Sequence, residues 1–270
     1  MSIFYHKLSS GFISSIISTM SKLYLSVVIP SFNEMANLRK GVLDKIEKFL
    51  GNQKYEYEVI VVDDGSTDGS IELVEKFIKE NPNFKLIKNP HLGKAGAVTT
   101  GILAAVGDYI LFSDMDQATP IEELKKLLPY FEKGFDIVIG SRSTNRKGSP
   151  LSRQIISRAS IILRKLIVGI EEISDTQCGF KAFKKETAQK LFTRINDFHH
   201  GFKKISGSSV NSGFDVELLY LAEKMGFKIK EVQVEWLYVE TRRVSPIKDS
   251  VEGLIDLFRI KANAISRKYK

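Results

Sequence analysis

The stretch Glu-Val-Ile-Val-Val-Asp-Asp-Gly-Ser-Thr-Asp-Gly, residues 58–69, decides the fold class of this chain. A run of apolar residues ends in two carboxylates and a glycine-containing turn, and a segment with helical spacing of apolar residues follows at 70–80. Continuous apolar strands of this kind are buried on both faces, which is typical of a parallel sheet between helices. We therefore predict a strand at 58–62 and a helix at 70–80.

The order of strand and then helix repeats on both sides of that stretch. Further strands are predicted at 25–29, 84–88, 109–113 and 136–140, and further helices at 35–50, 94–105 and 121–131. This alternation predicts an α/β fold with a mostly parallel sheet and helices on both faces. Ligands bind at the carboxyl ends of the strands in such sheets, and polar clusters stand there at 30–34, 63–68, 114–116 and 140–142.

The regular alternation of strands and helices ends after Pro150. A basic and apolar helix is predicted at 152–168, a helix at 214–225 and a strand at 229–236, and a last amphipathic helix begins after Pro246. We expect residues 1–23 to be an N-terminal tail and residues 24–236 to form one domain. Residues 237–270 are expected to form a loop and an amphipathic helix that lies on a membrane surface.

Composition and charge limit the function classes. The 270 residues are 43% hydrophobic, which excludes a disordered chain. The chain contains one cysteine, which excludes a disulfide framework and a cysteine-based zinc site. No uncharged apolar run reaches the roughly 18 residues that a membrane-spanning helix needs. The net charge of +8 lies wholly in residues 151–270, which hold 22 basic and 14 acidic side chains. Such a basic half suggests a phosphate, nucleic-acid or membrane partner, with simple solubility as the alternative.

Asp114 and Asp116 form the strongest local signal. Two carboxylates one residue apart at the end of a strand can bind Mg²⁺ or Mn²⁺, which takes one or two protein carboxylates together with substrate phosphates. The ion would neutralise a diphosphate leaving group. The alternative is an acidic loop before the helix predicted at 121, because acidic side chains favour that end of a helix.

Two other clusters could recognise a nucleoside. Asp63 or Asp64 could accept a hydrogen bond from a nucleobase N–H or a ribose hydroxyl, while Phe32 could stack on a base that Glu34 also reaches. The alternatives are local, since the same residue types form turns and cap helices. That local role is the one we expect for Asp68.

Taken in order, these motifs resemble those of the family 2 inverting glycosyltransferases of GT-A fold. The motifs are Ile-Pro-Ser-Phe-Asn-Glu at 29–34, Val-Asp-Asp-Gly-Ser-Thr-Asp-Gly at 62–69, Gly-Lys-Ala-Gly-Ala at 93–97, Ser-Asp-Met-Asp at 113–116 and Ile-Gly-Ser-Arg at 139–142. The later segments Ser174–Phe183 and Phe214–Glu223 resemble the polyprenyl-phosphate sugar synthases, most nearly the dolichyl-phosphate glucosyltransferases. The resemblance implies that residues 24–236 are a glycosyltransferase domain of Rossmann-like GT-A fold.

The resemblance also implies roles for single residues. Those that match nucleoside-contacting positions are Pro30, Phe32, Glu34, Val62, Asp63 and Asp64. Those that match the metal and diphosphate motif are Asp114, Met115 and Asp116. Arg142 matches an arginine beside both the diphosphate and the acceptor phosphate. Arg158 and Arg243 are expected near the acceptor phosphate, with Arg242 as a substitute for Arg243. Ala118 stands where mannose synthases often carry a third polar metal ligand, and Gln117 could replace that ligand only with a different geometry.

The implied reaction is the inverting transfer of one hexose, with glucose favoured, to a polyprenyl or dolichyl phosphate. Because that acceptor is already anionic, positioning and charge stabilisation carry most of the catalysis, and the expected catalytic residues are Asp116, Arg142, Arg243 and Asp215. Asp175 and Asp215 could orient sugar hydroxyls, act as a base for a hydroxyl acceptor, or be structural. The alternatives are a GDP-mannose-dependent synthase, a transferase to a hydroxyl acceptor, and a non-catalytic binding module.

The expected partners follow from this reaction. They are a nucleotide sugar (UDP-glucose or GDP-mannose), Mg²⁺ or Mn²⁺, a polyprenyl or dolichyl phosphate, and a membrane surface, on whose cytoplasmic face we expect a peripheral protein. No nucleic-acid partner is expected, since aromatic and basic residues do not interleave and no reader motif is present. The adjacent histidines His199 and His200 are expected in a solvated loop, and Cys178 is expected to be buried.

Overall fold

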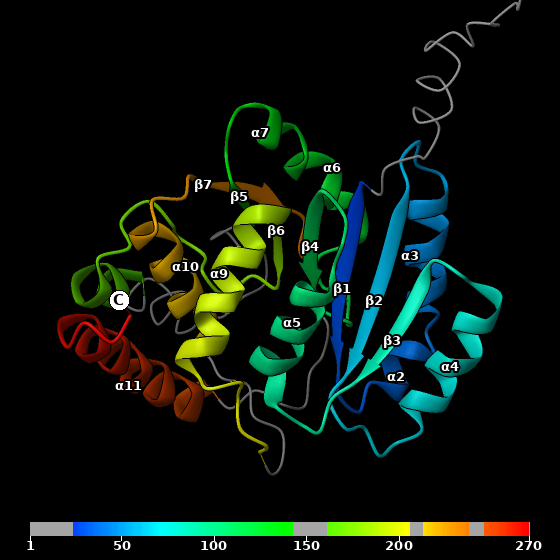
Figure 1. Cartoon of the computed structure of the whole chain (residues 1–270), viewed down its shortest axis with the longest axis horizontal. Helices are drawn as coiled ribbons and strands as arrows, with labels where there is room; N and C mark the ends of the chain where they lie inside the picture. The colour runs from blue at the N-terminus through cyan, green and yellow to red at the C-terminus, as the bar shows by residue number, and fades with distance from the viewer. Residues whose placement is uncertain (1–23, 143–160, 206–212, 238–245, 270) are drawn as a thin grey trace, which may run out of the picture.

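One mixed sheet forms the centre of the protein (Figure 1). The structure is a computed structural model that describes residues 24–142, 161–205, 213–237 and 246–269. Within these ranges, seven strands are arranged in the order β3-β2-β1-β4-β6-β5-β7. Their bounds are β1 Leu25–Ser31, β2 Tyr57–Asp63, β3 Phe84–Lys88, β4 Tyr109–Ser113, β5 Ile137–Arg142, β6 Phe180–Lys184 and β7 Ile229–Val234. The predicted α/β fold is confirmed.

The strand directions place several strand ends at one edge of the sheet. Neighbouring strands are parallel except β6, which is antiparallel to both β4 and β5. Ser31 and Asp63, the last residues of β1 and β2, are register partners, and β6 begins opposite Ser113, the last residue of β4. We call this side of the sheet, where β1, β2, β4 and β5 end, the carboxyl edge.

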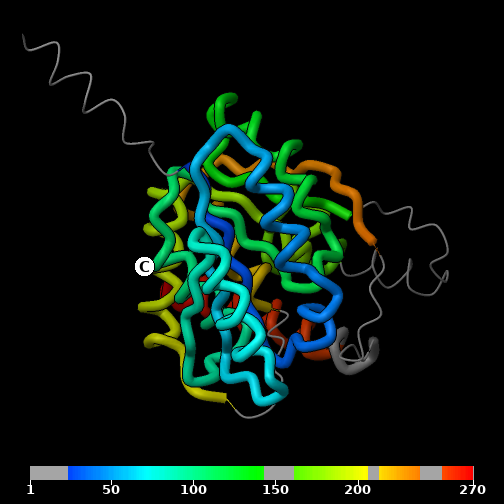
Figure 2. The backbone as a smooth tube through the Cα atoms, turned by 90° about the vertical axis from the view of Figure 1, so that its right-hand side faces the viewer, coloured from blue at the N-terminus to red at the C-terminus, as the bar shows by residue number. Residues whose placement is uncertain are grey.

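Helices cover both faces of the sheet. On one face lie α5 Gly93–Ala104, α9 Lys185–Phe198, α10 Phe214–Lys224 and α11 Pro246–Ile265. On the other face lie α3 Val42–Gly51, α4 Ser70–Glu80, the 3₁₀ helix η1 Ile121–Glu123, α6 Leu124–Leu127 and α7 Pro129–Glu132. In Figure 2, α4 and β3 are nearest to the viewer and α11 is far from the viewer. Because both faces of the sheet are covered, the central strands β1, β2 and β4 consist mostly of buried apolar residues without alternation.

Several predicted elements differ from those observed. The helix predicted at 35–50 is two helices, α2 (Met35–Leu38) and α3, because Gly41 between them has a left-handed φ of 69°. The helix predicted at 121–131 is divided into η1, α6 and α7, and Pro129 begins α7. The antiparallel strand β6 and helix α9 were not among the predictions. The tail 1–23 and residues 152–160 of the predicted basic helix lie outside the described residues, whereas 161–168 are helical.

The predicted last helix is present as α11 and is amphipathic in its packing. Leu257 and Ile260 are buried against the core, while Val251, Ile255 and Phe258 are more than half exposed. Among the residues described, no helix combines the length and the apolar character that a membrane crossing requires.

Candidate active site

Two loops at the carboxyl edge form one wall. The loop after β1 and the loop after β2 are joined by the side chain of Asn33, whose Oδ1 accepts from the Thr67 N–H at 2.8 Å. Ser66 Oγ accepts from the Asn33 N–H at 2.8 Å, and Ser70 Oγ accepts from the Glu34 N–H at 3.0 Å. These reciprocal bonds hold the predicted nucleoside-contacting turn 30–34 against the turn 63–68.

The aspartates of the second loop are engaged in local hydrogen bonds. Asp63 accepts from the N–H groups of Gly65 and Ser66 at 3.0 and 2.8 Å. Asp64 accepts from the N–H groups of Leu92 and Gly93, both at 2.7 Å, and so caps the start of α5. The structure therefore gives both residues a loop-building role, and their contact with a nucleobase stays a prediction.

Asp68 has the local role that the sequence predicts. Its carboxylate accepts from the N–H of Ser70 at the start of α4 and from the N–H of Met35 at the start of α2, both at 3.1 Å. Burial by itself raises the pKa of Asp68, but its bonds to Ser70 and Met35 lower the pKa below the usual value. Asp68 thus joins two helices and caps one of them.

Phe32 stacks on His91, a residue absent from the predictions. The two ring centroids are 4.3 Å apart and the ring planes differ by 17°. His91 has a left-handed φ of 60°, and its Nδ1 lies 2.7 Å from the Asp64 carbonyl oxygen and 2.9 Å from Asp64 Oδ2. The aromatic surface expected from Phe32 alone is therefore a pair of rings that Asp64 holds.

Two of the predicted substrate-contacting residues, Val62 and Met115, have buried side chains. The side chain of Val62 is fully buried between sheet and helices, and Met115 is 2% exposed and packs into the core. Their apolar side chains are used in packing, so only their backbone groups could meet a ligand. Pro30 is the register partner of Val62 and is half-buried. The Glu34 carboxylate accepts from Asn37 Nδ2 at 2.6 Å.

Asp114 lies next to a lysine that was not predicted to take part. Lys94 Nζ is 2.7 Å from Asp114 Oδ1, and the Asp114 side chain is 35% exposed. Burial by itself lowers the pKa of Lys94, but the charges of Asp114, Asp215 and Asp116 raise it to about 12. Lys94 stands in the first turn of α5, so the carboxyl edge holds a fixed positive charge beside the predicted metal ligands.

The residues around Asp114 fit a small divalent cation. Asp114 and Asp116 provide carboxylate oxygens from one three-residue turn, and Asp116 Oδ1 also accepts from the Ala118 N–H at 3.0 Å. Gln117 donates from Nε2 to Ser113 Oγ and to the Asp114 carbonyl oxygen, both at 3.0 Å. No group of three histidine, cysteine or acidic side chains gathers for a metal within the described ranges. Two carboxylates are a sufficient protein contribution for a cation that also binds substrate phosphates.

Arg142 and Asp175 form a bidentate ion pair at the end of β5. Arg142 Nε and Nη2 each donate to the Asp175 carboxylate at 2.7 Å, and the Arg142 backbone N–H donates at 2.9 Å. Glu231 accepts from the N–H groups of Ser174 and Asp175 and so holds the loop in place. Burial by itself raises the pKa of Asp175, but the bonds to Arg142 hold this pKa below its usual value. Arg158, Arg242 and Arg243 lie outside the described residues.

Asp215 is paired with a lysine inside the protein. Lys181 Nζ, on a side chain with no exposed surface, donates to Asp215 Oδ1 at 2.5 Å and to the Cys178 carbonyl oxygen at 2.6 Å. The Asp215 side chain is 10% exposed. An aspartate in such a pair is an oriented, charged group, and its role as a base for a hydroxyl acceptor stays a prediction.

Comparison with known proteins decides the family. Residues 26–203 match the profile described as Glycosyl transferase family 2. The chain belongs to glycosyl transferase family 2. The resemblance found in the sequence is confirmed, and the protein is a glycosyltransferase.

Relatives of this family 2 chain share one description. The chain is 33% identical over 263 residues to "Dolichyl-phosphate beta-glucosyltransferase" of Dictyostelium discoideum, and this alignment covers 90% of this chain and 75% of that protein. It is 34% identical over 260 residues to the Drosophila melanogaster protein of the same description, covering 88% and 74%. The human protein of that description is 31% identical over 265 residues, with the same coverage of 88% and 74%.

Solved structures share the fold of this family 2 enzyme. A mannosyltransferase from Pyrobaculum calidifontis in complex with GDP-Man and Mn²⁺ has a TM-score of 0.60 at 19% identity, covering 92% of this chain and 65% of that one. Glucosyl-3-phosphoglycerate synthase from Mycobacterium tuberculosis, with Mn²⁺, UDP and its product, has a TM-score of 0.56 at 18% identity, covering 97% and 87%. At these identities the likeness establishes the fold, and the predicted GT-A architecture is confirmed.

The family 2 site contains residues that the sequence reasoning missed or misplaced. Lys94 and Lys181 each lie in a segment that resembles the family, but their pairings with Asp114 and Asp215 were not foreseen, and nothing in the sequence marked His91. His199 and His200 lie in the turn after α9 as expected, and His200 is exposed, but His199 Nε2 lies 2.7 Å from Glu217 Oε2 of α10. Cys178 is buried as expected, and burial raises the pKa of its thiol to about 11.

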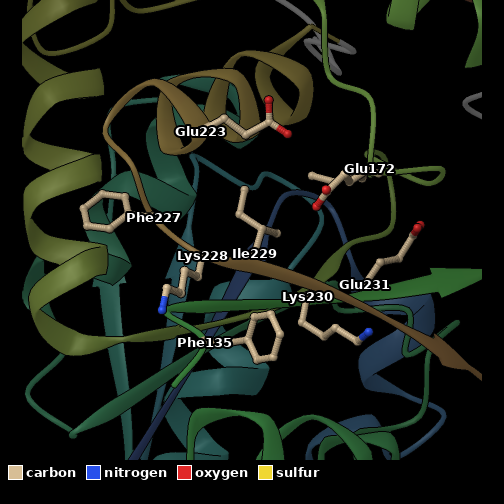
Figure 3. Close-up of a pocket in the computed structure, with 9 residues that line it drawn as sticks. Phe135, Glu172, Glu223, Phe227, Lys228, Ile229, Lys230 and Glu231 are labelled. Atoms are coloured by element: carbon tan, nitrogen blue, oxygen red, sulfur yellow. The ribbon is translucent and has the colours of Figure 1, made fainter. Parts of the chain in front are cut away.

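A hollow of about 470 Å³ lies away from this family 2 site (Figure 3). Phe135, Glu172, Glu223, Phe227 and Ile229 are among its lining residues. It stands at the beginning of β7, whereas Arg142 is the register partner of Val234 at the end of that strand. The hollow therefore lies toward the opposite end of β7 from the carboxyl edge.

Gly179 allows a close approach that is testable in this family 2 enzyme. A Cβ added at Gly179 would lie 1.8 Å from Asp114 Oδ2, so Gly179→Ala must displace the Asp114 carboxylate. We expect the Mn²⁺-dependent affinity for UDP to fall by about tenfold or more, as for lost metal-supporting contacts, while the melting temperature changes little. Isothermal titration calorimetry measures the affinity. The control is Gly51→Ala, where the added Cβ meets only the ends of flexible side chains, and equal affinities in both variants would contradict the prediction.

Proposed function

We propose that this family 2 enzyme transfers one glucosyl residue, with inversion, from UDP-glucose to dolichyl phosphate or another polyprenyl phosphate. The observation that carries the proposal is the presence, at one edge of the sheet, of a carboxylate pair suited to a cation–diphosphate group and of Arg142 suited to an anionic acceptor. The relatives described as dolichyl-phosphate beta-glucosyltransferases support glucose as the sugar and a lipid phosphate as the acceptor.

The donor end is proposed at Asp114, Asp116 and Lys94. Mn²⁺ or Mg²⁺ bound by the two carboxylates would spread the charge that develops on the diphosphate leaving group. Lys94 adds a positive charge beside Asp114, which favours the same phosphate oxygens. Mn²⁺ in two solved structures of this fold supports a divalent ion, and the choice between the two metals is part of the proposal.

The nucleoside end is proposed along the wall made by the loops after β1 and β2. Phe32 and His91 offer stacked ring surface, and Glu34 lies in the same loop as Phe32. Pro30, Asp63 and Asp64 shape this wall through the register and hydrogen bonds given above. This wall would orient the base, so that the diphosphate reaches Asp114.

The acceptor end is proposed at Arg142. Its bonds to Asp175 use Nε and Nη2, so the pair fixes the plane of the guanidinium and leaves the Nη1 hydrogens for a phosphate oxygen. A phosphate is ionised at neutral pH and attacks without a strong base, so holding it in line opposite the leaving diphosphate is the main task. Arg158 and Arg243 remain predicted helpers.

A hydroxyl acceptor is the main alternative. It would require a base, and the predicted base Asp215 is tied to Lys181 at 2.5 Å. This ion pair favours a role for Asp215 as an oriented carboxylate over a role as a proton acceptor. It therefore supports a phosphate acceptor over a hydroxyl acceptor. GDP-mannose as donor is a second alternative. It is supported by the Pyrobaculum calidifontis mannosyltransferase, which shares the fold and was solved in complex with GDP-Man.

Membrane association is proposed through α11. Val251, Leu254, Ile255 and Phe258 form an exposed apolar row while Leu257 and Ile260 hold the helix to the core. Basic side chains such as Arg259 and Lys261 stand on the same helix, a combination typical of helices in a membrane interface. A lipid-linked acceptor requires a site at such a surface. The cytoplasmic face is the proposed side.

The exposed row of α11 is expected to control binding to vesicles. The Phe258 side chain is 58% exposed, so Phe258→Asp removes apolar surface and adds a negative charge without changing a buried side chain. We expect the fraction bound to anionic phospholipid vesicles in co-sedimentation to fall by about tenfold, since a large apolar side chain contributes about 1.5–3 kcal/mol when buried. Leu103→Asp, at an exposed apolar residue of α5, is the control. Equal losses in the two variants would show that the row is not the contact.

The proposed function is tested by a transfer assay. Purified protein with Mn²⁺ is offered UDP-glucose, UDP-galactose or GDP-mannose, each with dolichyl phosphate or dolichol. We expect glucose transfer from UDP-glucose to the phosphate alone. Transfer to dolichol would support the hydroxyl alternative, transfer from GDP-mannose would change the donor, and no transfer from any pair would end the proposal.

A further inference from the structure

Lys181 is the fully buried cation next to the candidate site. It lies in the middle of β6, opposite Phe112 of β4, and none of its side-chain surface is exposed. Its ammonium group lies 5.8 Å from the Phe112 ring centroid, while the ammonium group of Lys94 lies 5.3 Å from the same centroid. A buried charge is costly to desolvate, and apolar side chains of similar size commonly stabilise a core as well or better. Stability alone therefore gives no reason for a lysine here.

The hydrogen bonds of Lys181 lead to both ends of the site. Its Nζ donates to the carbonyl oxygen of Cys178 at 2.6 Å. The next residue, Gly179, accepts from the Asp114 N–H at 3.1 Å and touches the Asp114 carboxylate so closely that no Cβ fits. The turn that ends at Gly179 begins with Asp175, the partner of Arg142. One ammonium group thus fixes the turn between the metal-binding and acceptor-binding residues.

The second bond of Lys181 joins this turn to α10. Asp215, in the first turn of α10, accepts from Nζ at 2.5 Å and supplies the counter-charge. A cation with two directional bonds holds the carbonyl group and the helix in one geometry, which an apolar side chain does not.

We propose that Lys181 is a positioning residue of the transfer reaction, which sets the 175–179 turn and through it the places of Asp114 and of the Arg142–Asp175 pair. This inference rests on the proposed function for its reaction, but its test is a binding measurement. Lys181 itself touches no substrate in this role.

The test separates positioning from stability with three variants. Lys181→Met leaves Asp215 buried without its cation and is expected to lower the melting temperature strongly. Lys181→Met/Asp215→Leu replaces the pair by apolar side chains and is expected to recover most of that loss. If Lys181 positions the turn, the double variant still binds UDP in the presence of Mn²⁺ about 10- to 100-fold more weakly than the wild type, the range for contacts that support metal ligands. Asp215→Asn keeps an oxygen acceptor for Lys181 but removes its counter-charge, so it is expected to be less stable than the wild type and to bind UDP more tightly than the double variant.

A matched control removes a hydrogen bond to the same helix, α10. Tyr269 donates to Glu217 Oε1 at 2.5 Å, so Tyr269→Phe removes a bond to a buried carboxylate of α10 other than Asp215. This variant is expected to lose stability and keep its affinity for UDP and Mn²⁺. Wild-type affinity in the double variant overturns the inference, and an equal loss in Asp215→Asn assigns the effect to the Asp215 carboxylate instead. A wild type that binds nucleotide but glucosylates no lipid phosphate overturns the proposed function alone, whereas a wild type that binds no nucleotide overturns both.

Discussion

Asp114→Asn is expected to lower kcat/KM for sugar transfer by about a thousandfold, because a metal clamp on a leaving group contributes several kcal/mol and each 1.36 kcal/mol is a factor of ten. The amide keeps the shape of the side chain but removes the negative charge that attracts both the cation and Lys94, whose Nζ lies 2.7 Å away. Initial rates measured across a Mn²⁺ titration check this prediction. The variant should require more Mn²⁺ as well as react more slowly.

Asp68→Asn is the control for the Asp114 prediction. Asp68 is an acidic residue in a neighbouring loop of the carboxyl edge, but its carboxylate caps α4 and holds α2. Its replacement is expected to lower the melting temperature and to leave the Mn²⁺ dependence unchanged. If Asp114→Asn shows the same Mn²⁺ dependence as the wild type, the assignment of the metal to this turn is wrong.

Arg142→Lys is expected to lower kcat/KM for the phosphate acceptor by about a hundredfold, since lysine cannot pair with Asp175 through two parallel bonds and present further donors in a fixed plane. The affinity for UDP and Mn²⁺ should stay close to that of the wild type, because the donor end lies at Asp114 and Lys94. Steady-state kinetics with varied acceptor at saturating donor, together with calorimetric titration of UDP, separates the two effects.

Two further variants serve as comparisons for Arg142→Lys. Asp175→Asn removes the charge that orients the guanidinium, and it is expected to give a smaller loss in the same direction. Arg194→Lys changes an arginine of α9 that donates to the Tyr269 carbonyl oxygen at 2.8 Å, and it should change neither parameter. An unchanged acceptor KM and kcat in Arg142→Lys would remove Arg142 from the acceptor site.

The parts of the fold that could be predicted are those encoded over a few neighbouring residues. The apolar run 59–62 predicts a buried strand, and β2 extends over Tyr57–Asp63 with all its residues buried. The polar residues after each strand also predict the edge where the site lies, because parallel strands bring their carboxyl ends together. The division of the predicted helix 35–50 was missed, because Gly41 is tolerated in an amphipathic pattern and its φ of 69° is a property of the folded chain.

The less predictable parts of the site depend on distant pairings. Arg142 and Asp175 are 33 residues apart, and Lys181 and Asp215 are 34 residues apart. Both pairs form because β6 enters the sheet antiparallel between β4 and β5, and no local pattern indicated that strand. The stacking of Phe32 on His91 likewise needs the loops after β1 and β3 to meet.

By itself, the sequence determined the alternation of strands and helices, the loops proposed to carry the chemistry and the family of the enzyme, because each depends on residue types at short spacing. Only the tertiary structure decided which charged groups are paired: Lys94 with Asp114, Arg142 with Asp175, and the buried Lys181 with Asp215. The reason is physical, since an ion pair is selected by distance and burial, and both are set by sheet order and register rather than by the neighbours of a residue along the chain.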